Sequence, residues 1–322
     1  MESTVPHLHD GGMPMRYGAH LPLIDFDDAG WQQGALAAYA NAARDLGYRY
    51  LCANDHVTYQ RPWLDGIVAL SSIVEHSDAM QLVTSVSLPV VRGPANLAKA
   101  AAALDVLSGG RLTLGVGPGS SVRDYAAVGI AFEERWARLD ETVRVLRSHL
   151  GNGVPPFHGR FYSTDVELSP RPVHDGGVPI WIGSWGSAAG MRRVARLADG
   201  WLGSAYNLSP KAVVEARTVL GEALAKAGRS IVGFPCSLAT MWTYVTEDAG
   251  ERDRYLATTA TMLGKPVEIL ADQLLIGSAE HCARVVAAYA EAGIEAMFIW
   301  PLADPEHQLE RVMRDVAPRV TS

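Results

Sequence analysis

The feature that most constrains this chain is the alternation of short apolar runs with segments of helical periodicity along most of its length. Several of the apolar runs are rich in Val, Leu or Ile and apolar on both faces, which is typical of buried parallel strands. Because parallel strands are joined through helices, the alternation predicts an α/β fold. The predicted strands are Tyr17–Leu21, Tyr48–Ala53, Leu82–Leu88, Leu112–Val116, Pro179–Ile182, Gly200–Leu202, Leu238–Val245 and Ile294–Trp300.

Helical periodicity fills the segments between these strands. Apolar residues recur at three- and four-residue spacing, as on the buried face of a helix. One such stripe is followed by Gly109, a typical stop signal after a helix. The three clearest stripes are Leu97, Ala100, Leu104 and Leu107; Trp136, Leu139, Val143, Leu146 and Leu150; and Met191, Val194, Ala195 and Ala198.

Eight strand and helix units favour a (β/α)8 TIM barrel, with an open doubly wound sheet as the alternative. The 322 residues leave about 40 residues for each unit, which is above the usual length, so insertions are expected. The Pro/Gly-rich segment 151–178 is predicted to be an insertion before strand five, and the stretch between strands seven and eight is too long for one helix. Residues 16–322 are predicted to form a single domain, after a flexible N-terminal tail over residues 1–15. In that tail, His7, His9 and Asp10 are either metal ligands or part of a disordered end.

Composition excludes several classes of protein. No apolar run approaches the 18 residues of a membrane-spanning helix. The net charge is −7 and no Lys/Arg-rich block stands out, which argues against a nucleic-acid partner. The three scattered cysteines form neither a disulfide framework nor a metal motif, and the first residues lack a secretory signal, so a cytoplasmic protein is expected.

Asp55 and His56 follow strand two directly. In a βα barrel the active site lies at the carboxyl ends of the strands, so this pair is predicted to lie at the barrel mouth. An imidazole there is a candidate proton donor or acceptor. The alternative is that Asp55 caps the loop and His56 packs in the core.

Two glycine-containing loops and one small-residue segment are further candidates. Gly117 and Gly119 follow strand four and permit close approach of a ligand, although Pro118 and Ser120 break the dinucleotide fingerprint; a tight turn is the alternative. After strand five, the run Gly183, Ser184, Trp185, Gly186 and Ser187 opens a helix, where free backbone amides bind phosphate; ordinary capping by Ser187 is the alternative. The small-residue segment lies in strand three and consists of Thr84, Ser85 and Val86. Its small side chains would permit close approach of a planar ligand, and a plain barrel strand is the alternative.

Tryptophans fall near several predicted strand ends. Trp63, Trp185, Trp201 and Trp300 would form aromatic walls for a flat ring or an apolar substrate, and ordinary packing is the alternative.

The order of these segments resembles the luciferase-like flavin and deazaflavin oxidoreductases. The resemblance extends from about Arg16 to the end of the chain and is most specific in the runs LDVLSGGRLTLGVGPG and PIWIG…ADGW. The matching stretches are Leu46–His56, Leu82–Gly119, Arg135–Leu146, Pro179–Trp201 and Gly277–Pro301.

This resemblance implies a (β/α)8 barrel that is usually dimeric and binds FMN or coenzyme F420 at the strand ends. Asp55-His56 and Thr84-Ser85-Val86 match the F420-dependent branch, in which a non-prolyl cis peptide, here between Ser85 and Val86, lies behind the deazaflavin ring. The cofactor would then contact Ser85, Val86, Gly117, Gly119, Gly183, Ser184, Trp185 and Gly186.

The implied function is F420-dependent hydride transfer to or from an uncharged small organic substrate. His56 would manage the substrate proton, with Asp55 setting its tautomer or supporting the loop, and Trp63, Ser120 and Trp300 would line the substrate pocket. Ser120 stands where the sugar-phosphate dehydrogenases of this branch carry Glu, and no matching set of Lys and Arg is apparent, so a sugar phosphate is not expected. The alternatives are an FMN-dependent monooxygenase that uses reduced flavin and O2, and a flavin-binding protein without turnover.

Overall fold

The computed structural model describes residues 15–26 and 30–320. The candidate ligands His7, His9 and Asp10 lie outside the described residues. The division into a tail over residues 1–15 and one domain over residues 16–322 therefore stays a prediction.

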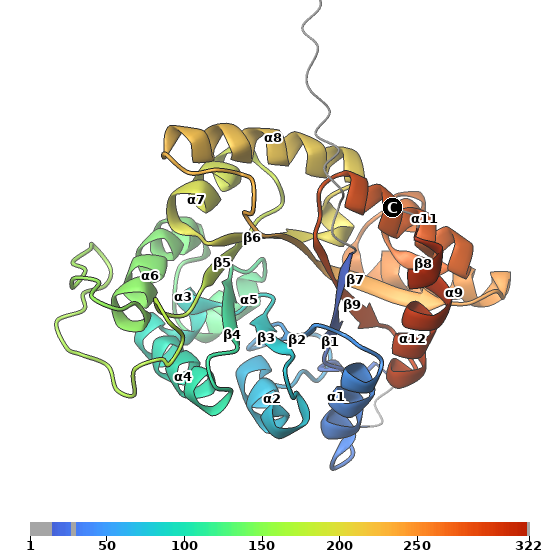
Figure 1. The fold of residues 1–322 in the computed structure, drawn as a ribbon, viewed down its shortest axis with the longest axis horizontal. Coiled ribbons are helices and arrows are strands. Elements are labelled where there is room, and N and C mark those ends of the chain that lie inside the picture. Colours follow the sequence, from blue (N-terminus) through green and yellow to red (C-terminus); the bar gives the residue numbers. More distant parts are fainter. Residues whose placement is uncertain (1–14, 27–29, 321–322) are drawn as a thin grey trace, which may run out of the picture.

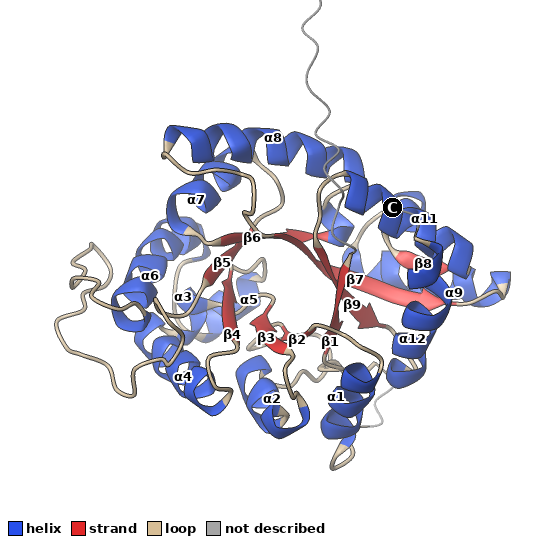
Figure 2. Ribbon diagram, viewed as in Figure 1, coloured by secondary structure: helices blue, strands red, loops and turns tan. Residues whose placement is uncertain are grey.

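Eight parallel strands close into a barrel, with helices packed around the outside (Figure 1, Figure 2). Each strand pairs with its neighbour in chain order from β1 to β7, and the ring closes because β9 pairs with both β7 and β1. The TIM barrel is thus confirmed, and the open sheet is excluded. The barrel strands are β1 Arg16–His20, β2 Tyr50–Ala53, β3 Gln81–Thr84, β4 Leu112–Val116, β5 Ile180–Gly183, β6 Gly200–Ser204, β7 Cys236–Val245 and β9 Ala296–Pro301.

One short strand was not predicted. β8, Leu275–Gly277, pairs only with the last three residues of β7 and lies outside the ring. It forms because β7 is ten residues long and shifts register between Leu238 and Met241, where Thr240 has a positive φ of 56°. Along one edge, the start of β7 pairs with β6 and its last three residues pair with β8, whereas β9 pairs with β7 on both sides of the bulge.

The helices cover the outer face of the barrel (Figure 2). They are α1 Ala35–Asp45, α2 Gly66–Ser72, α3 Pro89–Arg92, α4 Pro94–Leu107, α5 Val122–Ala127, α6 Arg135–Leu150, α7 Ala188–Leu197, α8 Pro210–Lys226, α9 Ala249–Leu263, α10 Val267–Gln273, α11 Ala279–Glu291 and α12 Pro305–Arg311. The three predicted stripes lie on or at the end of α4, α6 and α7, and most of their residues are buried. Two residues depart from the prediction: Leu107 is 65% exposed at the end of α4, and Trp136 is 38% exposed at the start of α6.

The barrel interior is filled by alternate residues of the strands. Tyr50 and Cys52 of β2 belong to a small inner cluster, whereas Leu51 and Ala53 belong to the large core between strands and helices. This is the period of two that a strand imposes on its side chains. A Cβ at Gly18 would lie 2.6 Å from the ring of Phe298, so the absence of a side chain there makes room for an interior aromatic.

The predicted insertion before strand five is present as the long loop beside α6 in Figure 1. Two buried or half-buried carboxylates hold it against the barrel. Glu141 accepts hydrogen bonds from three consecutive loop amides, residues 160–162, and Asp105 accepts from the amides of Val173 and His174. Because the carboxylates satisfy the loop's free amides, the segment is anchored without secondary structure of its own.

No helix among the described residues is long and apolar enough to cross a membrane.

Candidate functional site

A cavity of about 520 Å³, which we call the mouth cavity, opens at the carboxyl ends of the barrel strands. Five predicted residues line it: His56, Trp63, Ser120, Trp185 and Trp300. They come from the loops after β2, β4 and β5 and from the end of β9. The parallel barrel brings these loops together because all its strands end at the same side.

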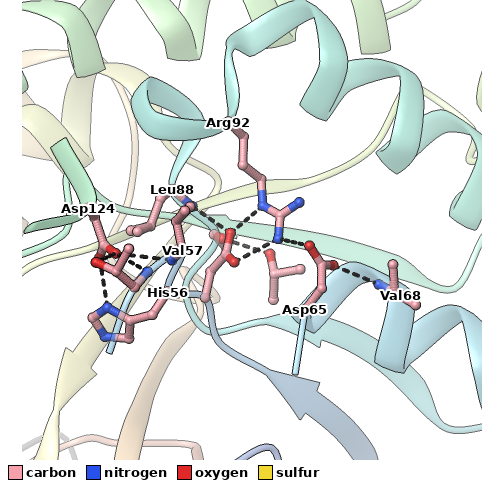
Figure 3. Close-up of polar contacts among 11 residues, drawn as sticks. His56, Val57, Asp65, Val68, Leu88, Arg92 and Asp124 are labelled. Atoms are coloured by element: carbon pink, nitrogen blue, oxygen red, sulfur yellow. Dashed lines mark hydrogen bonds and ion pairs between the residues drawn. The ribbon is translucent and has the colours of Figure 1, made fainter. Parts of the chain in front are cut away.

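His56 is held by a carboxylate that the sequence reasoning missed. Its Nδ1 lies 2.7 Å from Oδ2 of Asp124, which is fully buried in the first turn of α5 (Figure 3). The other oxygen of Asp124 accepts hydrogen bonds from the amides of Val57 and Thr58 at 3.0 and 2.8 Å. One carboxylate therefore fixes both the loop after β2 and the orientation of the imidazole.

The contacts of Asp124 favour its charged form. Burial raises the pKa of this carboxyl, but the hydrogen bonds from His56 and from the two loop amides outweigh it, so the pKa lies below its ordinary value of 3.8. A carboxylate facing Nδ1 places the ring proton on that nitrogen. The Nε2 lone pair of the neutral ring is then free, and 18% of the side chain is exposed.

The prediction that Asp55 sets the tautomer of His56 is wrong. Asp55 is buried and forms a bidentate ion pair with Arg92, which also contacts Asp65 at 2.5 Å (Figure 3). Asp55 further accepts a hydrogen bond from the amide of Leu88 at 3.3 Å. It therefore ties the loop after β2 to α3 and to the start of α2, in agreement with the alternative of loop support.

Ser85 and Val86 lie at the end of β3, and the peptide bond between them is cis, as the resemblance implies. The Val86 side chain rests against two glycines on neighbouring strands. A Cβ would lie 2.8 Å from Val86 at Gly117 and 2.9 Å from it at Gly183. Val86, Gly117 and Gly183 together form a ledge at the strand ends on which Val86 carries the only side chain, and none of the three lines the mouth cavity itself. Gly119 has a φ of +71°, which favours glycine.

The turn after β5 shows ordinary capping. The Ser187 hydroxyl accepts a hydrogen bond from the amide of Gly190 at 3.1 Å, and Gly186 has a φ of +79°. Ser184 is buried, and its carbonyl accepts from the indole of Trp201 at 3.0 Å. Trp201 thus supports this turn from the core and does not form the expected wall. Phosphate binding at the turn stays a prediction.

The aromatic wall is larger than the sequence indicated. Trp242, which was not singled out, contacts Trp300 edge to face with ring centroids 5.7 Å apart, and Trp63 contacts Trp300 at 5.8 Å. His20, at the end of β1, stacks on Trp300 with centroids 3.7 Å apart. Burial lowers the pKa of His20 to about 3, so this ring is neutral at ordinary pH.

Two of the missed residues carried a usable signal. Asp124 follows the loop after strand four at the start of a helix, where a carboxylate is favoured and where barrel active sites lie. His20 stands at the end of the first predicted strand. Trp242 lies inside a long predicted strand, and nothing in the sequence separates it from a core residue.

Among the described residues, no group of three or more His, Cys, Asp or Glu is placed to hold a metal ion.

Comparison with known proteins identifies relatives of this chain. The curated F420-dependent glucose-6-phosphate dehydrogenase of Rhodococcus erythropolis is 28% identical over 323 residues, covering 88% of this chain and 93% of that protein. The enzyme of the same name from Nocardia farcinica is 29% identical over 294 residues, covering 82% and 84% of the two chains.

Solved structures share the fold at lower sequence identity. An F420-dependent secondary alcohol dehydrogenase, in complex with an F420-acetone adduct, has a TM-score of 0.83 at 16% identity and covers 96% of this chain and 100% of its own. A monooxygenase from Streptomyces bottropensis has a TM-score of 0.81 at 20% identity, with 95% and 98% covered. The family model for luciferase-like monooxygenases matches residues 29–265, most of the barrel. The chain therefore belongs to the luciferase-like monooxygenase family.

Proposed function

We propose that this protein is an F420-dependent oxidoreductase that transfers a hydride between the deazaflavin and the uncharged reacting end of a small organic substrate. The observation that carries the proposal is the His56–Asp124 pair at the mouth cavity, on the loops that flank the ledge of Val86, Gly117 and Gly183. The curated relatives named above are F420-dependent dehydrogenases, which supports the choice of cofactor.

The ledge fits a planar cofactor. Because Gly117 and Gly183 carry no side chain, Val86 packs closely on both, and a flat ring would then lie against Val86 without being displaced by further side chains. Ser85 and Val86 would lie behind such a ring, and the turn from Gly183 to Gly186 would face the cofactor's phosphate. When bound, the deazaflavin supplies the carbon that gives or accepts the hydride.

The residues of this chain would orient the substrate and move its proton. Asp124 holds Nδ1 of His56, which leaves Nε2 directed away from the carboxylate and available to the substrate. In the oxidation of an alcohol, Nε2 would accept the hydroxyl proton, and in the reverse reaction it would return it. Asp124 would stabilise the imidazolium formed in between.

The walls of the mouth cavity favour an apolar reacting end. Trp63 and Trp300 offer aromatic surface that would exclude water from the reacting carbon. Ser120 lines the cavity, and by the resemblance described above it stands where the sugar-phosphate dehydrogenases of this branch carry Glu. This difference supports a substrate other than a sugar phosphate.

Parallel titration of the purified protein with F420 and with FMN tests the cofactor. We expect F420 to bind more tightly, and a panel of secondary alcohols and ketones should then change the deazaflavin absorbance of the complex. FMN affinity equal to or above that of F420 would overturn the proposal and favour the FMN-dependent monooxygenase.

We also propose that the protein is a homodimer, as the resemblance implies. Light scattering on the eluting peak of a sizing column tests this directly, and a mass of one chain at micromolar concentration would contradict it.

A further inference from the structure

The chemistry of the mouth cavity changes from its floor to its rim. Trp242 and Trp300 are 3% and 2% exposed and form an apolar floor. Two cationic side chains line the same cavity: Arg123, which is exposed on α5, and Lys265, which is half buried just after α9. The two cationic side chains are therefore more exposed to solvent than Trp242 and Trp300.

Both cations lack a partner. Within residues 15–26 and 30–320, neither the guanidinium of Arg123 nor the ammonium of Lys265 makes a hydrogen bond or an ion pair, and no carboxylate lines the cavity. Asp124 is next to Arg123 in the chain, but its carboxylate is buried. Its oxygens accept hydrogen bonds from His56 and from the loop after β2. The lining of this cavity is cationic although the whole chain has more acidic than basic residues, 35 against 28.

Two positive charges without a partner in one cavity attract an anion. A cleft lined by charges of one sign concentrates their field, so a negative group placed there is favoured. Without these charges, the aromatic floor of Trp242 and Trp300 would suit a cationic ligand. Arg123 and Lys265 would repel a cation, so an anionic ligand is favoured over a cationic one.

We propose that the substrate is amphipathic: a flat, apolar reacting end packs on the tryptophan floor, and an anionic group such as a carboxylate binds between Arg123 and Lys265. This inference rests on the proposed function, since it assigns the two ends of the same substrate. The only other source of the same anionic chemistry is the phosphate or carboxylate side arm of the cofactor.

A matched pair of probes tests the proposal. The F420-loaded protein is titrated by calorimetry at low salt with 2-naphthoate and with its neutral isostere 2-naphthamide. We expect naphthoate to bind about tenfold more tightly than the amide, and the preference to shrink at high salt. Arg123→Gln and Lys265→Gln should each remove part of this preference and leave the affinity for the amide unchanged.

Arg192→Gln on α7 and Lys226→Gln on α8 are matched controls, because both side chains are exposed and neither lines the cavity. Equal binding of the two probes, or no binding of naphthoate at millimolar concentration, overturns the proposal. If Arg123→Gln or Lys265→Gln weakens F420 binding and leaves the probe preference intact, the cations bind the cofactor's side arm and the proposal is also wrong. Failure of the proposed function itself would show separately, as F420 binding no tighter than FMN to the wild-type protein.

Discussion

Nδ1 of His56 lies 2.7 Å from the carboxylate of Asp124, although the two residues are 68 positions apart in the chain. One follows β2 and the other lies in the first turn of α5, which follows the loop after β4. The pair joins the loops that follow β2 and β4, two strands separated by β3, and sets the direction in which the imidazole presents Nε2.

Replacing Asp124 by Asn should test whether this residue positions the imidazole of His56. The Asn side chain has one oxygen, so it cannot accept hydrogen bonds from Nδ1 and from both loop amides in the same geometry, and the ring loses its fixed tautomer. We expect turnover to fall about 10- to 100-fold, with the pH profile of kcat shifted and cofactor affinity nearly unchanged. Asp315→Asn, which alters a surface ion pair with Arg311, is the control. A purely structural role would lower the melting temperature and leave the pH profile in place.

His56→Ala should remove proton transfer without removing the cofactor site. For a reaction that moves a substrate proton, general acid–base catalysis is worth about 10²–10⁴ in rate, so turnover should fall by that factor. F420 affinity and the melting temperature are measured on the same sample and should stay close to those of the wild type. Normal turnover on the true substrate would remove His56 from the mechanism.

Asp55→Ala should act on stability, since its carboxylate is buried against Arg92. Removing one partner of a buried ion pair typically lowers the free energy of unfolding by about 3–5 kcal/mol. Because Arg92 keeps its ion pair with Asp65, we expect a loss near the lower end of this range. Urea unfolding measures the free energy of unfolding. Asp253→Ala, in an exposed pair with Arg252, should cost less than about 1 kcal/mol. Equal losses in the two variants would show that the Asp55 pair is not structurally special.

His20 should make the protein less stable in mild acid. Burial lowers its pKa from 6.5 to about 3, so between these values the unfolded chain binds a proton that the folded protein does not. The free energy of unfolding therefore falls as pH decreases below about 6.5, with a slope of at most about 1.4 kcal/mol per pH unit from this residue. Unfolding curves at several pH values should show a smaller slope for His20→Gln than for the wild type. Identical slopes would mean that His20 is not buried in its neutral form.

Gly117→Ala should disturb the ledge at the strand ends. The new methyl group would lie 2.8 Å from Val86 and push that side chain toward the space proposed for the ring. We expect F420 affinity to fall about tenfold and to recover in the double variant Gly117→Ala/Val86→Ala. Gly221→Ala on α8, where the nearest atom is 3.8 Å away, should leave cofactor affinity unchanged. An unaltered F420 affinity in Gly117→Ala would place the ring elsewhere.

The barrel could be predicted from the sequence alone, because buried parallel strands and the helices that cover them each produce a local pattern of apolar residues. The first seven predicted strands overlap β1 to β7 in order, and the eighth overlaps β9. The departures are local: β3 ends at Thr84 because Pro89 opens α3 soon after, and the three residues of β8 are too few to produce a pattern.

Site residues were predictable where they lie at a strand end or in the loop that follows it, as His56 and Trp300 do. The carboxylate that holds His56 could be identified only from contacts across the fold. Asp55 is adjacent in the chain, but at the end of β2 it points toward Arg92, and Asp124 reaches the imidazole from another loop. The sequence likewise did not indicate that Arg123 and Lys265 line the same cavity, because this depends on how segments far apart in the chain meet at the mouth of a closed barrel. Periodicity reports which face of an element is buried, whereas the partner of a polar side chain is set by contacts across the fold.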